Sequence, residues 1–480
     1  MSTSVSPAAS TAARTRAPSL VLACLATTML LPSLGTSVAN VALPTFVDAF
    51  HTSFRAVQWV VLAYLLAVTT LVVSVGRLGD LVGRRRLLLV GVTVFAVASL
   101  ACGASSALWM LVLGRAGQGL GAAVMMALSL ALVGDAVPQE RAGRAMGFLG
   151  TMSAVGTALG PSLGGLLLAG LGWRSIFFLQ VPLGLLALAL AAASLPPDAP
   201  RARQASFDVV GSALLAITLA AYALSMTLGH GALDPLALAL FGVAVAGAAL
   251  FVRVQAHRAA PLVRLALFRD RAVGAGFAMS ALVTTVAMTT LVVGPFHLAR
   301  ALGLSPASVG LVMTAGPLVA AIAGVPAGRA VDRFGARGVT LAGLAAMTLG
   351  CVALALLPAV SGVAGYAMPL VAITAGYATF QAANNTAVVA AVDAAQRGVV
   401  SGLLNLSRNL GLVTGASAMG AVFAIGTGAA EVGAASASAV AAGTQVAFGV
   451  AAMLVLGALG LALRMAARAP RVARVAGGSA

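Results

Sequence analysis

Long apolar segments recur along the whole chain and limit its fold more than any other feature. A helix needs about 20 mostly apolar residues to cross the hydrocarbon core of a bilayer. Fourteen segments meet that requirement, near residues 19–46, 57–76, 87–105, 108–134, 145–170, 175–194, 208–228, 235–254, 272–296, 307–328, 338–357, 363–388, 398–425 and 444–465. Only 8% of the residues are charged, against roughly 25% in soluble domains. The chain is therefore predicted to be an all-α integral membrane protein.

The basic residues indicate an orientation in the membrane. All 28 are Arg, and they stand in short clusters between apolar segments, which excludes nucleic acid as a partner. If the N-terminus is inside, 23 of the 28 fall in the tails or the even-numbered loops, and Arg55, Arg174 and Arg300 fall outside. Basic residues concentrate on the cytoplasmic side. We therefore expect a multi-pass protein of the cytoplasmic (inner) cell membrane with both termini in the cytoplasm.

Residues that carry chemistry in enzymes and metal sites are sparse. The three cysteines lie far apart inside apolar segments, and the four histidines lie at or near segment ends without partner spacing. Neither pattern is typical of a metal, redox or hydrolytic centre. We expect no enzyme activity, no metal and no cofactor.

One loop occurs twice. The repeated positions are Gly76, Arg77, Asp80 and Gly83 after the second segment, and Gly328, Arg329, Asp332 and Gly335 after the tenth. All four pairs share one offset (328 − 76 = 252), which indicates two homologous halves separated by an inserted helix pair. The predicted units are a cytoplasmic tail (1–17), an N-terminal six-helix bundle (18–195), a cytoplasmic linker (196–207), the inserted pair (208–255), a basic cytoplasmic loop (256–271), a C-terminal six-helix bundle (272–466) and a second tail (467–480).

The first copy of this loop, with Arg84 and Arg85 directly after it, resembles the cytoplasmic signature of the major facilitator superfamily. Its glycines permit a tight turn, and Asp80 is placed to cap a helix N-terminus or to pair with Arg. The resemblance implies that this loop and its second copy latch the two bundles and release them as the transporter changes state. The alternative is a plain anchor of positive charge at the membrane surface.

Two further motifs fit the same family. On the fourth segment, Arg115, Gln118 and Gly119 resemble the family's second motif, in which the Arg lines the cavity and takes part in proton handling. A charged side chain at membrane depth costs about 2.5–3.5 kcal/mol or more, so Arg115 and Arg408 are functional candidates. On the fifth segment, the antiporter motif, which marks exporters in the family, is matched by Gly156, Gly160, Pro161, Gly164 and Gly165.

The number of segments, with Gln58, Trp59 and Tyr64 on the second, resembles the fourteen-span drug:proton antiporter branch of this superfamily. The resemblance implies a major facilitator fold, with two six-helix bundles around a cavity and two extra central helices. It further implies a monomer in the lipid bilayer that exports small-molecule drugs or similar amphipathic compounds by alternating access, driven by the proton gradient. The alternative is export of a specific endogenous neutral or anionic metabolite with different coupling.

The first segment departs from the branch at one position. The branch carries Asp where this chain has Gly35, and none of the 11 acidic residues sits clearly at mid-membrane. Either Asp48 or Asp135 lies deeper than the pattern indicates, or coupling differs, or the substrate is neutral or anionic. Polar or soft side chains at membrane depth are the candidates for the cavity wall or for contacts between helices, namely Thr36, Asn40, Met125, Met126, Gln381, Asn384, Asn385, Asn405 and Arg408.

Overall fold

A computed structural model of the chain describes residues 18–136, 139–195, 197–198, 208–228, 234–258, 270–356, 362–392, 397–429 and 432–468. Within these residues it contains 14 helices that are long and apolar enough to cross a membrane, which confirms the predicted fold class. The two predicted tails lie outside the described residues. Because the number of spans is even, the start of the first span and the end of the last lie at one end of the molecule, here called the terminus end. The opposite end carries helix α2 and is called the α2 end.

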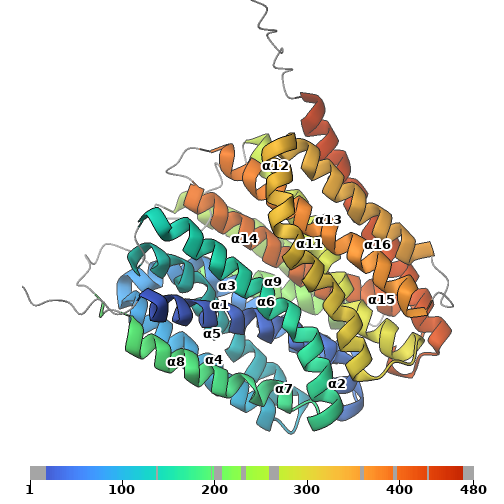
Figure 1. The fold of residues 1–480 in the computed structure, drawn as a ribbon. Helices are drawn as coiled ribbons and strands as arrows, with labels where there is room; N and C mark the ends of the chain where they lie inside the picture. Colours follow the sequence, from blue (N-terminus) through green and yellow to red (C-terminus); the bar gives the residue numbers. More distant parts are fainter. Residues whose placement is uncertain are drawn as a thin grey trace, which may run out of the picture.

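The first six spans form the N bundle (Figure 1). It consists of α1 (Pro18–Val41), α2 (Leu43–Phe50), α3 (Phe54–Val82), α4 (Arg84–Ala104), α5 (Leu108–Ala136), α6 (Gln139–Leu171), α7 (Ser175–Phe178) and α8 (Gln180–Ser194). The inserted pair is α9 (Val209–Leu228) and α10 (Pro235–His257).

The last six spans form the C bundle. It consists of α11 (Arg271–Phe296), a π-helical turn η2 (His297–Ala301), α12 (Pro306–Leu356), α13 (Gly362–Ala390), α14 (Arg397–Thr414), a second π-helical turn η5 (Gly415–Met419), α15 (Gly420–Gly426), a 3₁₀ turn η6 (Val432–Ala434) and α16 (Ala437–Arg468). The two bundles converge at the end where α2 and α15 lie (Figure 1).

Four predicted segments differ in detail from the helices observed. The segment predicted at 19–46 is two helices, because Pro44 stands in the first turn of α2, a position that favours a helix start. The segments predicted at 307–328 and 338–357 are continuous in α12 except at Gly335, whose φ of 78° breaks the helix. The segment at 398–425 is interrupted by η5.

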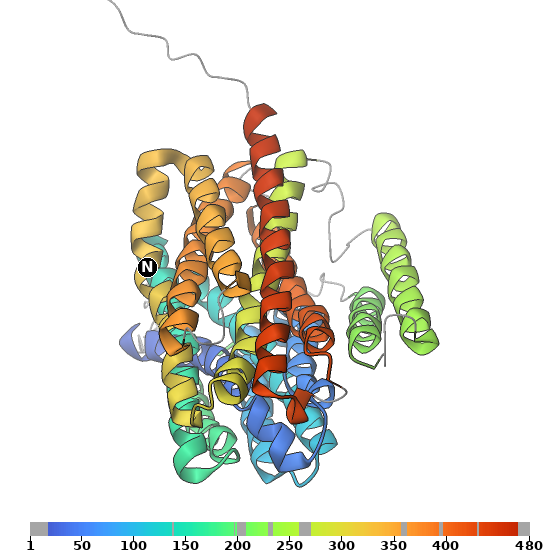
Figure 2. The same cartoon turned by 90° about the vertical axis from the view of Figure 1, so that its right-hand side faces the viewer.

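The inserted pair attaches to the N bundle through polar contacts on α9. Trp59 Nε1 of α3 donates to Thr227 Oγ1 at 3.1 Å, and the hydroxyls of Ser74 and Ser212 lie 2.8 Å apart. Helix α10 packs mainly on α9, and only 6% of its most apolar stretch is buried in the protein. Figure 2 shows the pair, in green, at one side of the molecule. It therefore lies at the periphery and not between the bundles.

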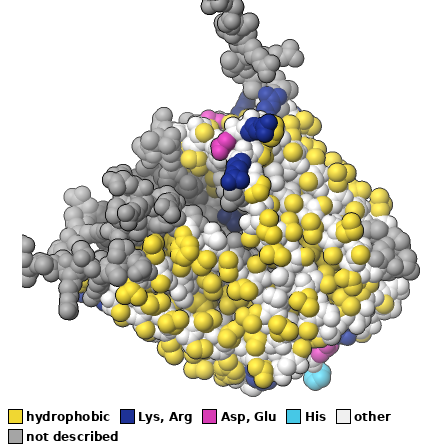
Figure 3. All heavy atoms as spheres, in the orientation of Figure 1, with side chains coloured by type: hydrophobic (Ala, Val, Ile, Leu, Met, Phe, Trp, Pro, Cys, Tyr) yellow, Lys and Arg dark blue, Asp and Glu magenta, His cyan; other side chains and the backbone are white. Residues whose placement is uncertain are grey.

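The surface is that of a protein immersed in lipid. Apolar side chains cover most of the face in Figure 3, and charged side chains gather at its two ends. Asp48, Arg300 and Asp234 lie at the α2 end, while most of the other described charges lie toward the terminus end. Water at both ends and lipid between them account for this distribution.

Candidate functional site

Arg115 of α5 is fully buried inside the N bundle. Its Nε donates to the carbonyl oxygen of Val60 at 2.8 Å, and its Nη1 donates to the carbonyl oxygen of Gly35 at 3.0 Å and to Gln118 Oε1 at 2.8 Å. The guanidinium carbon lies 4.3 Å from the centre of the Tyr64 ring, a cation–π contact. Nη2 has no hydrogen-bond partner among the described residues. The charge is thus held by carbonyls and an aromatic face, with no carboxylate among these contacts.

Gln118 extends this network toward α4 and α8. Its Nε2 donates to Ser99 Oγ at 2.6 Å and to Gln180 Oε1 at 3.3 Å. A Cβ atom added to Gly35 would lie 3.0 Å from the same Gln180 oxygen. The position at which the branch keeps an acid therefore faces a neutral amide. Sequence reasoning missed Gln180 and Ser99, although a single Gln in the apolar segment 175–194 was a signal for the first.

Gly119, the third residue of this motif, has a packing role. A Cβ atom at this position would lie 2.8 Å from the Cβ of Ala67 on α3. Only glycine permits so close an approach of α5 to α3.

The antiporter motif on α6 lies against both bundles. Gly164 faces α1, where an added Cβ would lie 2.8 Å from Val38 Cγ2, and Gly156 and Gly160 face the same helix. Gly165 faces α12 of the C bundle, where an added Cβ would lie 2.9 Å from the Cα of Gly310. The motif thus allows backbone contact within the N bundle and between the two bundles.

The two copies of the repeated loop differ in their surroundings. In the first copy, Gly83 separates α3 from α4 with a φ of 104°. Asp198 from the linker accepts the backbone N–H groups of Arg85 at 2.9 Å and Arg86 at 3.1 Å, and so caps α4. A carboxylate at a helix N-terminus is favourable. Arg84 and Arg85 also donate to carbonyls of Ala131 and Ala192 respectively.

Asp198, which the sequence analysis did not single out, is therefore an acid that caps α4. The side chains of Arg77 and Asp80 lie outside the described part of the structure. In the second copy, Arg329, Asp332 and Gly335 are exposed, and no described atom from another part of the chain lies within 4 Å of a Cβ added to Gly335 or Gly328. Within the described residues, a third segment of the chain holds the first copy but not the second.

The predicted cavity residues of the N bundle lie at different depths and degrees of burial. Thr36 Oγ1 and Asn40 Nδ2 donate to backbone carbonyls of α1 at 2.9 and 3.1 Å, and Asn40 Oδ1 has no partner among the described residues. Met125 is fully buried in the core, whereas Met126 is partly buried. Met125 is thus surrounded by packed side chains and does not face open space.

The polar residues of the C bundle lie nearer the terminus end. Gln381 Nε2 lies 3.0 Å from the Tyr377 hydroxyl, and Asn384 Nδ2 donates to the carbonyl oxygen of Gly276 at 3.1 Å. Asn405 is exposed, while Asn385 and Arg408 are partly buried. The structure does not place these residues in contact with the Arg115 network, so the sequence candidates form two groups.

Contacts at the α2 end join the bundles. Asp48 forms an ion pair with Arg300, and Phe54 packs edge-on against Phe296 with ring centres 4.7 Å apart. Deeper in the molecule, Gln58 Nε2 donates to the carbonyl oxygen of Ala416, in η5, at 2.6 Å. The exposed position of Asp48 removes it as the deep acid considered from the sequence. The side chain of Asp135 lies outside the described part of the structure.

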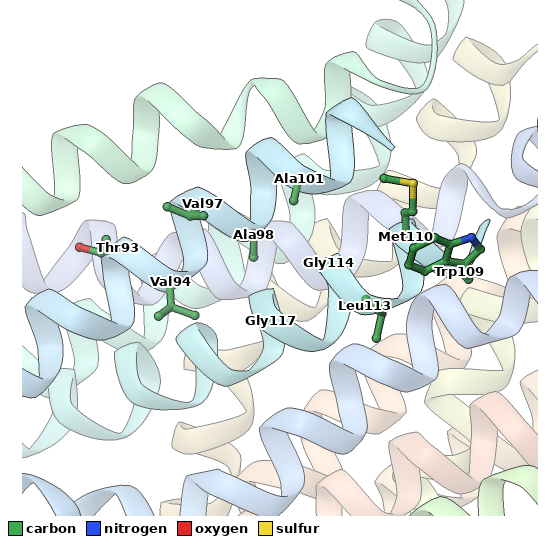
Figure 4. A pocket seen from close by; sticks show the side chains of 10 residues that line it. All are labelled: Thr93, Val94, Val97, Ala98, Ala101, Trp109, Met110, Leu113, Gly114 and Gly117. Carbon is green, nitrogen blue, oxygen red and sulfur yellow. The ribbon is translucent and has the colours of Figure 1, made fainter. Parts of the chain in front are cut away.

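Two apolar hollows lie on the flank of the N bundle, with volumes of about 510 and 590 Å³. The first runs between α4 and α5, and Figure 4 shows Val97 and Trp109 on its wall. The second is lined by α3, α5 and Thr227 of α9, and it shares Trp109 and Leu113 with the first. Neither hollow lies between the two six-helix bundles, where alternating access requires the substrate site.

Comparison with known proteins identifies relatives of this chain. The family model described as Major Facilitator Superfamily matches residues 25–416 and 273–479. Multidrug resistance protein Stp of Mycobacterium tuberculosis is 33% identical over 81% of this chain and 72% of its own. Riboflavin transporter RibZ of Clostridioides difficile is 31% identical over 84% of this chain and 88% of its own.

Among solved structures, a bacterial homologue of the human lysosomal transporter Spinster, in an inward-facing and unoccupied conformation, matches with a TM-score of 0.68 at 17% identity. The match covers 93% of this chain and 96% of that chain. At this identity the likeness concerns the fold.

Proposed function

Because the chain belongs to the Major Facilitator Superfamily, we propose that it exports drugs or other small amphipathic compounds across the cytoplasmic membrane by alternating access. The observation that carries this proposal is the antiporter motif, whose Gly165 brings α6 of the N bundle against Gly310 of the C bundle. Similarity to multidrug resistance protein Stp supports the substrate class. The terminus end, which carries most of the described arginines, faces the cytoplasm in this proposal.

The contacts at the α2 end act as the outer gate. The Asp48–Arg300 ion pair, the aromatic contact of Phe54 with Phe296 and the Gln58–Ala416 hydrogen bond all join the N bundle to the C bundle. The arrangement described here therefore corresponds to the state closed toward the outside. Rocking of the bundles about the substrate breaks these contacts and releases the compound outward. The transporter acts as a monomer, with the lipid bilayer and the small-molecule substrate as its partners and no cofactor.

The proton gradient drives export in this proposal. The described part of the chain places Arg115 in a neutral network of Gln118, Gln180 and Ser99. A cation held without a carboxylate favours neutral or anionic compounds over permanent cations, because an unpaired ion is costly to desolvate. The same network favours the second candidate function, export of a specific neutral or anionic metabolite with different coupling. Similarity to the riboflavin transporter RibZ also supports that candidate.

Transport into everted membrane vesicles tests both candidates. The probes are the neutral dye N-phenyl-1-naphthylamine, the anionic dye 8-anilino-1-naphthalenesulfonate and the cationic dye ethidium. Accumulation that nigericin abolishes by collapsing the pH gradient supports proton antiport. Accumulation that persists in nigericin favours different coupling. Absence of transport for all three dyes contradicts the export of amphipathic compounds.

A further inference from the structure

Buried polar atoms without a hydrogen-bond partner gather in one region of the C bundle. Among the described residues of the C bundle, these atoms are Ser280 Oγ of α11, Gln381 Oε1 and Asn385 Oδ1 of α13, and Arg408 Nε of α14. The N bundle has three such atoms, on Asn40, Arg85 and Arg115. A buried polar group that lacks a partner is costly, and most such groups in folded proteins are paired with protein, water or ligand. Four such atoms on three neighbouring helices point to a site that binds a polar group.

A hydrogen bond between α11 and α13 sets the depth of Ser280 in the membrane. The two helices run antiparallel, and Asn384 Nδ2 donates to the carbonyl oxygen of Gly276 at 3.1 Å. One helical turn farther from the terminus end, α11 presents Ser280 and α13 presents Gln381, because residues four and three positions apart lie on one helix face. Ser280 and Gln381 therefore lie at the same depth.

The contact between α11 and α14 brings Arg408 to this level. These helices run parallel, and a Cβ added to Gly411 would lie 2.9 Å from Thr284 Cβ, while one added to Gly415 would lie 2.5 Å from Met288 Cβ. Three residues before Gly411 stands Arg408, and four before Thr284 stands Ser280. Arg408 is thus level with Ser280.

Helix α14 carries a polar face that leads to this level from the terminus end. Asn405 is exposed, and Arg408 and Asn409 are partly buried. On the opposite side of the helix Leu403, and beside the polar face Leu404, are buried in a cluster that Leu66 of α3 packs against. Figure 1 shows α14 between α3 of the N bundle and α11 of the C bundle. Polar faces of membrane helices turn to a bundle interior or to water, so this face offers a route from the cytoplasm.

The described carboxylates lie away from this level. Asp48 and Asp234 stand at the α2 end. Asp198 after α8, Asp208 before α9 and Asp332 beside the break in α12 stand at the terminus end. Asp270 caps the first turn of α11, about 15 Å from Ser280 at the α-helical rise per residue. The site therefore presents a guanidinium and a hydroxyl that both donate hydrogen bonds, and an amide oxygen of Gln381 that accepts one. An acid with a neighbouring N–H or O–H group matches this set.

We propose that Arg408, Ser280 and Gln381 bind the acidic group of an exported compound, with Arg408 and Ser280 donating to its oxygens and Gln381 accepting from a neighbouring N–H or O–H. This inference rests on the proposed export function and narrows it to compounds that carry a carboxylate, sulfonate or phenolate.

Two matched dyes test the proposal in everted vesicles. The anionic dye 8-anilino-1-naphthalenesulfonate carries a sulfonate beside an N–H group, and N-phenyl-1-naphthylamine has the same skeleton without the sulfonate. In Arg408→Gln, transport of the anionic dye should fall about tenfold or more, as expected when a charged hydrogen-bond partner is lost. Transport of the neutral dye should stay within about twofold by the same reasoning. Arg408→Lys should recover part of the loss, and Ser280→Ala should affect only the anionic dye.

Arg464→Gln is the control, because Arg464 is an exposed arginine on α16 outside this site. This variant should transport both dyes at the wild-type rate. An equal loss of both dyes in Arg408→Gln, or no loss of either, overturns the proposal. Wild-type transport of the neutral dye without the anionic one also overturns it, yet leaves export itself intact. Transport of neither dye contradicts the proposed function as well.

Discussion

Arg115 Nη1 lies 3.0 Å from the carbonyl oxygen of Gly35, so the buried cation touches the backbone at the position where the drug:proton antiporter branch keeps an acid. The adjacent Nη2 has no partner in the described structure. A carboxylate at residue 35 would therefore enter the surroundings of an incompletely satisfied guanidinium. We therefore expect residue 35 to influence which substrate charge the transporter prefers.

Gly35→Asp should shift export toward cations. The wild type should transport neutral and anionic dyes better than ethidium, because its N-bundle network carries a positive charge without a carboxylate. The new carboxylate would counter Arg115, and the nearby Gln180 oxygen, 3.0 Å from an added Cβ, must turn away. The readout is the ratio of ethidium to N-phenyl-1-naphthylamine transport. Gly35→Asn adds nearly the same volume without charge and should leave the ratio unchanged. Robust wild-type export of ethidium would contradict the prediction.

Gly83→Val should reduce turnover and thermal stability more than Gly335→Val does. Both positions have positive φ, at 104° and 78°, which costs a branched residue about 1–3 kcal/mol. Only at Gly83 would the added side chain also collide with Asp198 and disturb the cap of α4. Unfolding temperature and dye transport of the purified, reconstituted variants give the comparison. Equal effects at the two positions would show that Asp198 adds nothing to this loop.

Gly160→Leu should abolish most export by forcing α6 away from α1. An added Cβ at Gly160 would meet Ser37, and overpacking of this kind costs about 1–3 kcal/mol or more. Gly170→Leu is the matched control on the same helix, since no described residue from elsewhere in the chain lies within 4 Å of a Cβ there. Export is measured at equal membrane abundance of the two variants. Normal efflux by Gly160→Leu would mean that the close approach of α6 to α1 is dispensable.

Gln58→Ala should shift the conformational equilibrium toward the state open at the α2 end. Loss of its hydrogen bond to Ala416 removes about 0.5–1.5 kcal/mol, a shift of roughly twofold to tenfold. The measurement is labelling of Asn40→Cys by an impermeant thiol reagent from outside, in a background without the native cysteines. Trp59→Phe is the control, because Trp59 bonds to Thr227 of the inserted pair and not to the C bundle. Unchanged labelling in Gln58→Ala would remove this bond from the outer gate.

A reporter fused after Ala480 should lie in the cytoplasm. Arginines in the tails and even-numbered loops outnumber those on the other side by 23 to 3, and basic residues resist transfer across the membrane. Paired alkaline phosphatase and green fluorescent protein fusions at this site distinguish the two sides. An extracytoplasmic terminus would reverse the orientation assigned to both ends.

The sequence by itself determined the number of membrane spans, because each span must satisfy its own backbone and present apolar side chains to lipid, and both requirements are local. It also singled out Arg115, since a charge inside an apolar segment is visible without a fold. The glycines of the antiporter motif were recognisable by their spacing alone.

Only the tertiary structure decided which residues meet. Asp198 caps a helix that begins 114 residues earlier (198 − 84 = 114), and Asp48 pairs with Arg300 across 252 residues. Ser280 could not be singled out from the sequence, because a lone serine in an apolar helix usually bonds to its own backbone. Its significance came from Gln381 of α13 and Arg408 of α14, which lie at the same depth. Pairings of this kind depend on how the helices pack, and the apolar pattern that places each helix in the membrane does not fix its partners or its rotation against them.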